Sequence, residues 1–63
     1  MIYENILEIA QKKQLSIRQI ESKAGLSFGA IGKWKTRSPQ VDNLMAVAKV
    51  LNVPINKLLE DKK

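Results

Sequence analysis

The chain has 63 residues, with 11 Lys and Arg against 6 Asp and Glu and with neither cysteine nor histidine. The missing cysteine and histidine exclude disulfides, cysteine nucleophiles, zinc sites built on those ligands and histidine-based acid–base catalysis. A domain of about 60 residues buries only about 60% of its unfolded surface, so there is room for one small core and no deep pocket. We therefore expect a single domain over residues 1–63 that is not an enzyme and has no cofactor and no metal.

The positive charge is concentrated in the middle of the sequence. The net charge is +5, and residues 22–41 contain no acidic residue while Lys23, Lys33, Lys35 and Arg37 fall inside them. A basic balance of this kind favours a polyanionic partner, although an ordinary solvated patch has the same composition.

No segment looks suited to a membrane. No apolar run approaches the roughly 18 residues that a spanning helix needs. The first residues carry neither a basic leader nor a long apolar stretch, so we expect no secretion signal, no membrane partner and a cytoplasmic location. Residues 61–63 are expected to form a frayed polar tail.

Residues 2–13 predict the first helix. Ile6 and Ile9 recur at helical spacing, and polar residues occupy the positions between them. Acidic residues come early in this segment and lysines late, which suits the helix dipole.

A second helix is predicted over about residues 16–24. Ser16 and Gln19 have the spacing of a capping box, which marks its start. Gly25 follows the segment and is the natural residue for a left-handed C-terminal cap. Leu26 is expected to anchor the chain to the core after this turn.

A third helix is predicted over about residues 27–35, with Ser27 as its N-cap. Ile31 and Trp34 are three residues apart and can share its buried face. Glycines at positions 29 and 32 weaken such a helix by about 1 kcal/mol each relative to alanine, so packing has to hold it in place.

A polar loop with a proline precedes a fourth helix over about residues 41–51, for which Asn52 is a C-terminal cap. A short fifth helix over about residues 55–60 completes an all-α fold without strands. Met45 and Val50 fall outside the inward stripe of the fourth helix and are either isolated exposed residues or part of a dimer face. The residues expected in the core are Ile6, Ile9, Ile20, Leu26, Ile31, Trp34, Leu44, Val47, Leu51 and Leu58.

The segment from Ser16 to Lys35 predicts a helix-turn-helix. Glycine at position 25 permits a sharp reversal because it tolerates positive φ. A third helix of about eight residues is about 12 Å long, which matches the width of about 12 Å of the DNA major groove. Its leading residues would project away from the core, as in phage repressors.

Taken together, these segments resemble the Xre family, the Cro/C1-type repressors of phages and bacteria. The resemblance covers roughly residues 6–59 and rests on residues 15–20, 23–27, 31–34, 39–44 and 47–53, with Leu58 and Leu59. It implies a compact five-helix lambda repressor-like domain and a transcriptional repressor or regulator of phage or bacterial type. It also implies binding to a double-stranded DNA operator, usually as a homodimer on a palindromic site.

The resemblance further implies which residues meet DNA. The base contacts, made by the third helix in the major groove, are expected from Ser27, Phe28, Gly29 and Lys33. The backbone contacts are expected from Ser16, Ile17, Arg18, Lys35, Arg37, Gln40 and Asn43. Phe28 can touch a thymine methyl group, which predicts apolar readout.

The sequence departs from the family pattern at several of these positions. Ile17 stands where a polar contact residue is common, and Phe28–Gly29 replaces a more usual polar pair. Glu21 stands where many members have alanine, which bears on how closely the two motif helices approach.

Two other functions remain open at this stage. An antitoxin-like or other protein-interaction module can use the same fold, with a partner on another surface. Binding to anionic membranes needs a basic helix with a clean apolar face, whereas the basic region here spans a turn and two glycines.

Overall fold

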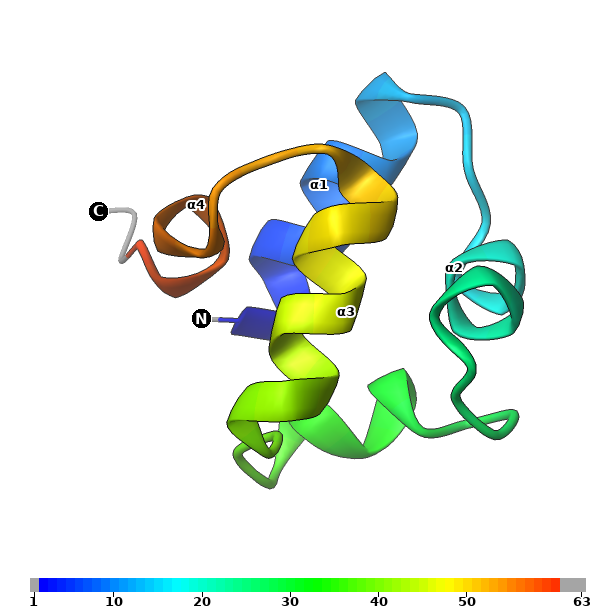
Figure 1. Ribbon diagram of the computed structural model, residues 1–63, viewed down its shortest axis with the longest axis vertical. Helices are drawn as coiled ribbons and strands as arrows, with labels where there is room; N and C mark the ends of the chain where they lie inside the picture. The colour runs from blue at the N-terminus through cyan, green and yellow to red at the C-terminus, as the bar shows by residue number, and fades with distance from the viewer. Residues whose placement is uncertain (1, 61–63) are drawn as a thin grey trace.

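Five helical segments follow one another along residues 2–60, the part of the chain that the computed structural model describes. They are α1 (Ile2–Lys12), α2 (Ile17–Ala24), the 3₁₀ helix η1 (Ile31–Lys35), α3 (Val41–Leu51) and α4 (Ile55–Leu59). In Figure 1, α3 crosses in front of α1, with α2 on one side of this pair and α4 on the other. The described residues therefore hold four α-helices and one 3₁₀ helix, which corrects the expected five α-helices. The predicted polar tail, 61–63, lies outside the described residues.

Local signals at the ends of α2 and α3 are confirmed. The N–H of Gln19 donates to Ser16 Oγ at 3.1 Å, and the N–H of Ser16 donates to Gln19 Oε1 at 2.8 Å, which completes the capping box. Gly25 (φ 75°) and Asn52 (φ 57°) both adopt the left-handed conformation that closes the preceding helix. These caps set where each helix stops and the chain turns.

One core joins all five segments. Its buried apolar residues are Ile6, Ala10, Ile20, Ile31, Leu44, Val47, Ala48, Leu51 and Leu58. Ile9, Leu26 and Trp34, which were also expected in the core, are half-buried and pack against its margin. Val50 packs there too, whereas Met45 is 55% exposed.

A buried asparagine fastens α4 to α1. Asn5 is 3% exposed, and its Nδ2 donates to the carbonyl oxygens of Leu58 at 2.9 Å and Glu60 at 2.6 Å. Carbonyl groups at the end of a helix have no partner within it, so these bonds satisfy two acceptors there. The short α4 is thus held by the buried side chain of Leu58 and by this polar contact.

The third segment differs from the prediction. Residues 28–30 form a turn, and the regular part begins only at Ile31. Ser27 is not the expected N-cap: its carbonyl accepts the N–H of Ala30 at 3.1 Å, and Ala30 caps η1 without a side-chain bond. Gly29 has φ 84°, which no helix can contain, because helical residues need φ near about −63°.

None of the helices in residues 2–60 is long and apolar enough to cross a bilayer.

Candidate nucleic-acid interface

An exposed turn joins the two helices of the motif. Residues 27–29 are all exposed, and Phe28 reaches 69% exposure although it is aromatic. This segment, here called the 27–30 turn, links α2 to η1 at the edge of the molecule (Figure 1). Lys33 is also exposed, so the four residues expected to contact bases all lie on the surface.

A buried carboxylate shapes the 27–30 turn from beneath. Glu21 is 3% exposed; its Oε1 accepts the N–H of Gly29 at 3.2 Å and its Oε2 accepts the N–H of Ile31 at 3.0 Å. The first N–H groups of a helix lack partners within it, so Glu21 does here what an N-cap side chain does elsewhere. Charged acceptors make stronger hydrogen bonds than neutral ones. Glu21 therefore links α2 to the start of η1 through two hydrogen bonds, and the chain between them is a turn and not a helix.

The same contact leaves the surrounding surface uniformly positive. Glu21 is the sole acidic residue among residues 16–41, and it is turned inward. The exposed charged side chains of that stretch are Arg18, Lys23, Lys33, Lys35 and Arg37. A surface with one sign of charge attracts a polyanion over a distance.

Arg18 and Phe28 lie together across the motif. The Arg18 guanidinium carbon is 4.6 Å from the centroid of the Phe28 ring. Cation–π contacts of this kind contribute about 0.5–1 kcal/mol at exposed sites, which restrains both side chains without burying them. A predicted backbone contact thus lies next to a predicted base contact.

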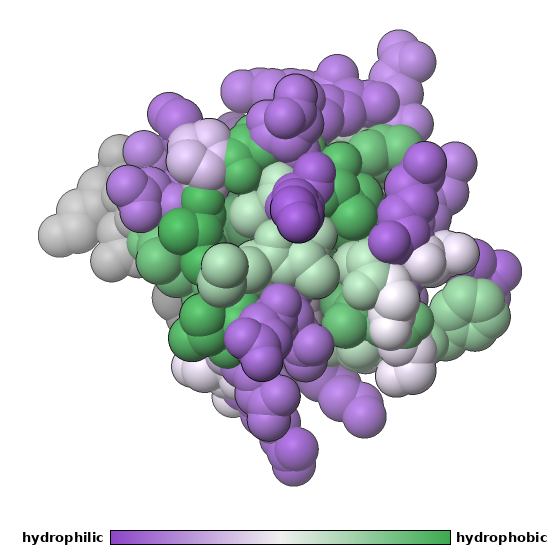
Figure 2. Space-filling view, in the orientation of Figure 1, coloured by the Kyte–Doolittle hydropathy of each residue, from purple (hydrophilic) through white to green (hydrophobic). Residues whose placement is uncertain are grey.

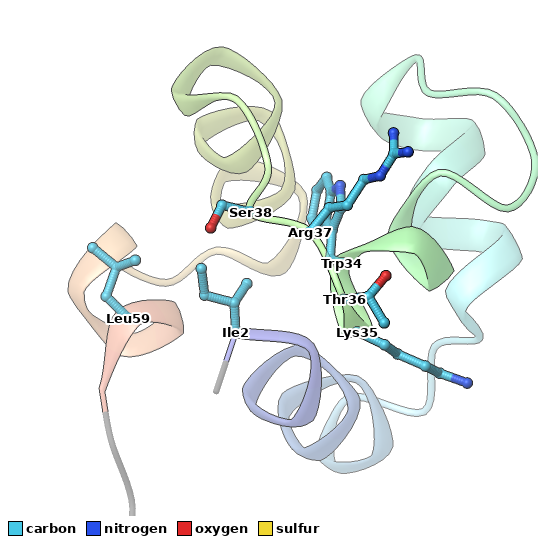
Figure 3. Close-up of a pocket in the computed structure, with 7 residues that line it drawn as sticks. All are labelled: Ile2, Trp34, Lys35, Thr36, Arg37, Ser38 and Leu59. Carbon is cyan, nitrogen blue, oxygen red and sulfur yellow. The ribbon is translucent and has the colours of Figure 1, made fainter.

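Lys35 lies apart from this group. Its Nζ is 5.1 Å from the centroid of the Tyr3 ring on α1. Figure 3 shows the Lys35 and Arg37 side chains pointing away from each other at one side of a hollow, with Ile2 and Leu59 at the other side. Of these two predicted contacts with the DNA backbone, the Arg37 side chain is thus the more available to a partner.

The other predicted backbone contacts differ in availability. Ser16 is exposed, but its Oγ already caps α2, and Ile17 is half-buried against the core. Gln40 is exposed at the start of α3, where it makes no side-chain cap bond, and Asn43 is half-buried. Free N–H groups at a helix start suit a phosphate oxygen.

The described residues, 2–60, contain no cluster of acidic side chains of the kind that binds metal ions. No group of three or more Asp and Glu side chains lies close enough there to hold a metal ion. What the arrangement can do is bind: it presents an exposed aromatic ring, open backbone and positive side chains.

A helix, a glycine turn and a second helical segment, with a cationic surface around them, define a helix-turn-helix DNA-binding domain. A family model described as helix-turn-helix matches residues 6–58, which is most of the chain. The protein therefore belongs to the Cro/C1-type helix-turn-helix family of DNA-binding regulators, which confirms the resemblance to the Xre family. A search among curated proteins found no match.

Proposed function

We propose that the protein is a sequence-specific transcriptional repressor that reads an operator in the major groove with the 27–30 turn and Lys33. The observation that carries the proposal is the Phe28 ring. It is 69% exposed, and every exposed charged side chain within residues 16–41 is positive. Apolar contact with a thymine methyl group and hydrogen bonds from lysine to guanine are two ways in which proteins distinguish bases there. Contacts from Arg18, Arg37 and the start of α3 would orient the domain on the phosphates.

Selection of duplexes from a random library tests this proposal. We expect a single preferred site, in which two half-sites are separated by about 34 Å, or one helical turn, if two protomers bind together. Equal recovery of all sequences would contradict sequence-specific binding. Repression itself is then tested by placing the selected site at a promoter and measuring transcription with and without the protein.

Lys33→Ala is expected to weaken binding to the selected site by about 1–3 kcal/mol and to relax preference at one position. The reason is that lysine donates to guanine O6 and N7, which no other base pair reproduces in the major groove. Titration of duplexes that differ at single positions measures the effect. Lys12→Ala, at an exposed lysine on α1, is the matched control. Even weakening across all duplexes would make Lys33 a phosphate contact instead.

The proposal includes a homodimer that pairs through the outer face of α3. Val41 and Met45 are 64% and 55% exposed there, and they share one side of the helix with Asp42 and Lys49. Figure 2, viewed from this side, shows apolar surface over α3 between hydrophilic side chains. In an antiparallel pair of α3 helices related by a two-fold axis near Met45, Asp42 of each protomer would oppose Lys49 of the other. A two-fold interface requires such a self-complementary patch.

Met45→Glu is expected to reduce self-association and to leave binding to an isolated half-site unchanged. A carboxylate at the centre of the interface would lose hydration without gaining a partner, which is costly in an apolar contact. Sedimentation of the free protein and of its operator complex measures the change in stoichiometry. Gln11→Glu adds the same charge at an exposed site on α1. If both variants dimerise like the unchanged protein, the α3 face is not the interface.

A further inference from the structure

We propose that Glu21 is a positioning residue that sets the base preference of the protein from inside the fold. The proposal rests on the DNA-reading role proposed above for the 27–30 turn. Glu21 itself is 3% exposed and cannot touch DNA. It acts on the residues that can.

One carboxylate fixes two peptide groups, the one between Phe28 and Gly29 and the one between Ala30 and Ile31. Its oxygens hold the N–H groups of Gly29 and Ile31, at 3.2 and 3.0 Å, so the orientations of both peptide planes are set together. Gly29 lies between them with φ 84°, a value that glycine adopts readily and that interrupts the helical path. The chain therefore passes over Glu21 as a turn, and the regular segment starts at Ile31.

The direction of Phe28 depends on that backbone. At 69% exposure, its ring has little packing of its own, and it lies beside the Arg18 guanidinium group. Phe28 directly precedes Gly29, so a change in the φ of Gly29 or in the peptide plane that Glu21 holds would redirect the ring. In the helix that the sequence pattern predicts over residues 27–35, Phe28 would project in another direction. Glu21 thus selects between two ways of presenting the same side chains to DNA.

Glu21→Gln and Glu21→Asp separate the shape of the side chain from its charge. Glutamine keeps the shape and has one acceptor oxygen in place of two, whereas aspartate keeps the charge but is shorter by one methylene group. Val47→Ala is the control, because it removes buried apolar volume on α3 and leaves Glu21 and the residues of the turn unchanged. Circular dichroism records helix content, and amide NMR shifts at Gly29 and Ile31 record whether the two bonds persist.

The decisive readout is base preference, measured by library selection for each folded variant. Phe28→Ala first identifies the operator position that Phe28 contacts, as the position at which preference is lost. We expect Glu21→Gln and Glu21→Asp to change preference there by about 5-fold or more, the low end of what a direct base contact provides. The Val47→Ala variant should bind duplexes with equal or lower affinity than the unchanged protein, and its order of preferred bases should be the same.

Three outcomes would overturn the inference. Unchanged base preference in Glu21 variants whose amide shifts show broken bonds would make the contact merely structural. An equal change in Val47→Ala would point to general loosening of the domain. Loss of helix content in both Glu21 variants would mean that the residue supports the whole fold and has no separate role in the turn. If the unchanged protein selects no preferred duplex at all, the proposed function fails instead, and this result is distinct from the other three.

Discussion

Raising the salt concentration from about 50 to about 200 mM is expected to weaken operator binding by about 10³–10⁵-fold, provided that a dimer contacts about 6–10 phosphates. Each lysine or arginine that neutralises a phosphate releases a condensed counterion, so affinity falls as free salt makes that release less favourable. Each protomer exposes Arg18, Lys23, Lys33, Lys35 and Arg37 along residues 16–41, and no exposed acid in that stretch offsets them. A dimer thus has enough cations to reach this number of contacts.

Titration of the selected duplex at several salt concentrations measures the slope of log affinity against log salt. Arg37→Ala should make the slope shallower by about 1 per protomer, which is the effect expected of a phosphate contact. Lys12→Ala, on α1, should leave it unchanged. A slope near zero would contradict the proposal that phosphate contacts carry most of the affinity.

Ile31→Ala is expected to lower the free energy of unfolding by about 2–5 kcal/mol. Ile31 is fully buried (0% exposed), so truncation removes apolar contacts and leaves a cavity. For a domain of this size the whole free energy of unfolding is about 3–9 kcal/mol, so the substitution would remove a large share of it. The loss also reaches the interface, because the N–H of Ile31 is one of the two that Glu21 holds.

Urea denaturation followed by circular dichroism measures this change. Phe28→Ala is the matched control, since it truncates another large apolar side chain of the same segment that is 69% exposed. It should cost at most about 1 kcal/mol, the value of an exposed cation–π contact, while weakening operator binding. Similar losses of stability in the two variants would show that Ile31 does not link η1 to the core as described.

Signals that depend on residues close in sequence were sufficient to predict much of the fold. The capping box at Ser16 and Gln19 and the left-handed caps at Gly25 and Asn52 each involve a few neighbouring residues. The helical spacing of apolar residues likewise predicted most of the core. These features follow from local geometry and periodicity, which a single sequence contains.

The errors fall where distant residues decide the structure. The third helix was predicted from Ser27 and the spacing of Ile31 and Trp34, but the acceptor that shapes its start, Glu21, lies eight residues before Gly29. The hydrogen bond from Asn5 to Leu58 joins residues 53 positions apart, and no local sequence pattern predicts it. From the sequence alone, a polar residue next to the apolar stripe of a helix is predicted to be exposed. Its burial becomes evident only when the packing of another element is known. Both missed contacts are buried polar side chains that satisfy backbone groups of another segment.

The sequence also predicted that Ser27, Phe28, Gly29 and Lys33 would face outward, and they are exposed. It could not foresee that the Lys35 ammonium group lies against the Tyr3 ring, because this contact joins η1 to α1. The structure therefore divides the expected DNA-contacting residues by how freely each can reach a partner, which their residue types alone do not reveal.

The bonds from Asn5 to the end of α4 have a practical consequence for experiments on this protein. They tether the last described residues to the first helix, on the side of the molecule opposite α2 (Figure 1). A purification tag or fluorescent dye attached on that side would lie away from the 27–30 turn, which is at the opposite edge of the molecule (Figure 1). Protein immobilised in this way should keep the turn open to duplexes in solution.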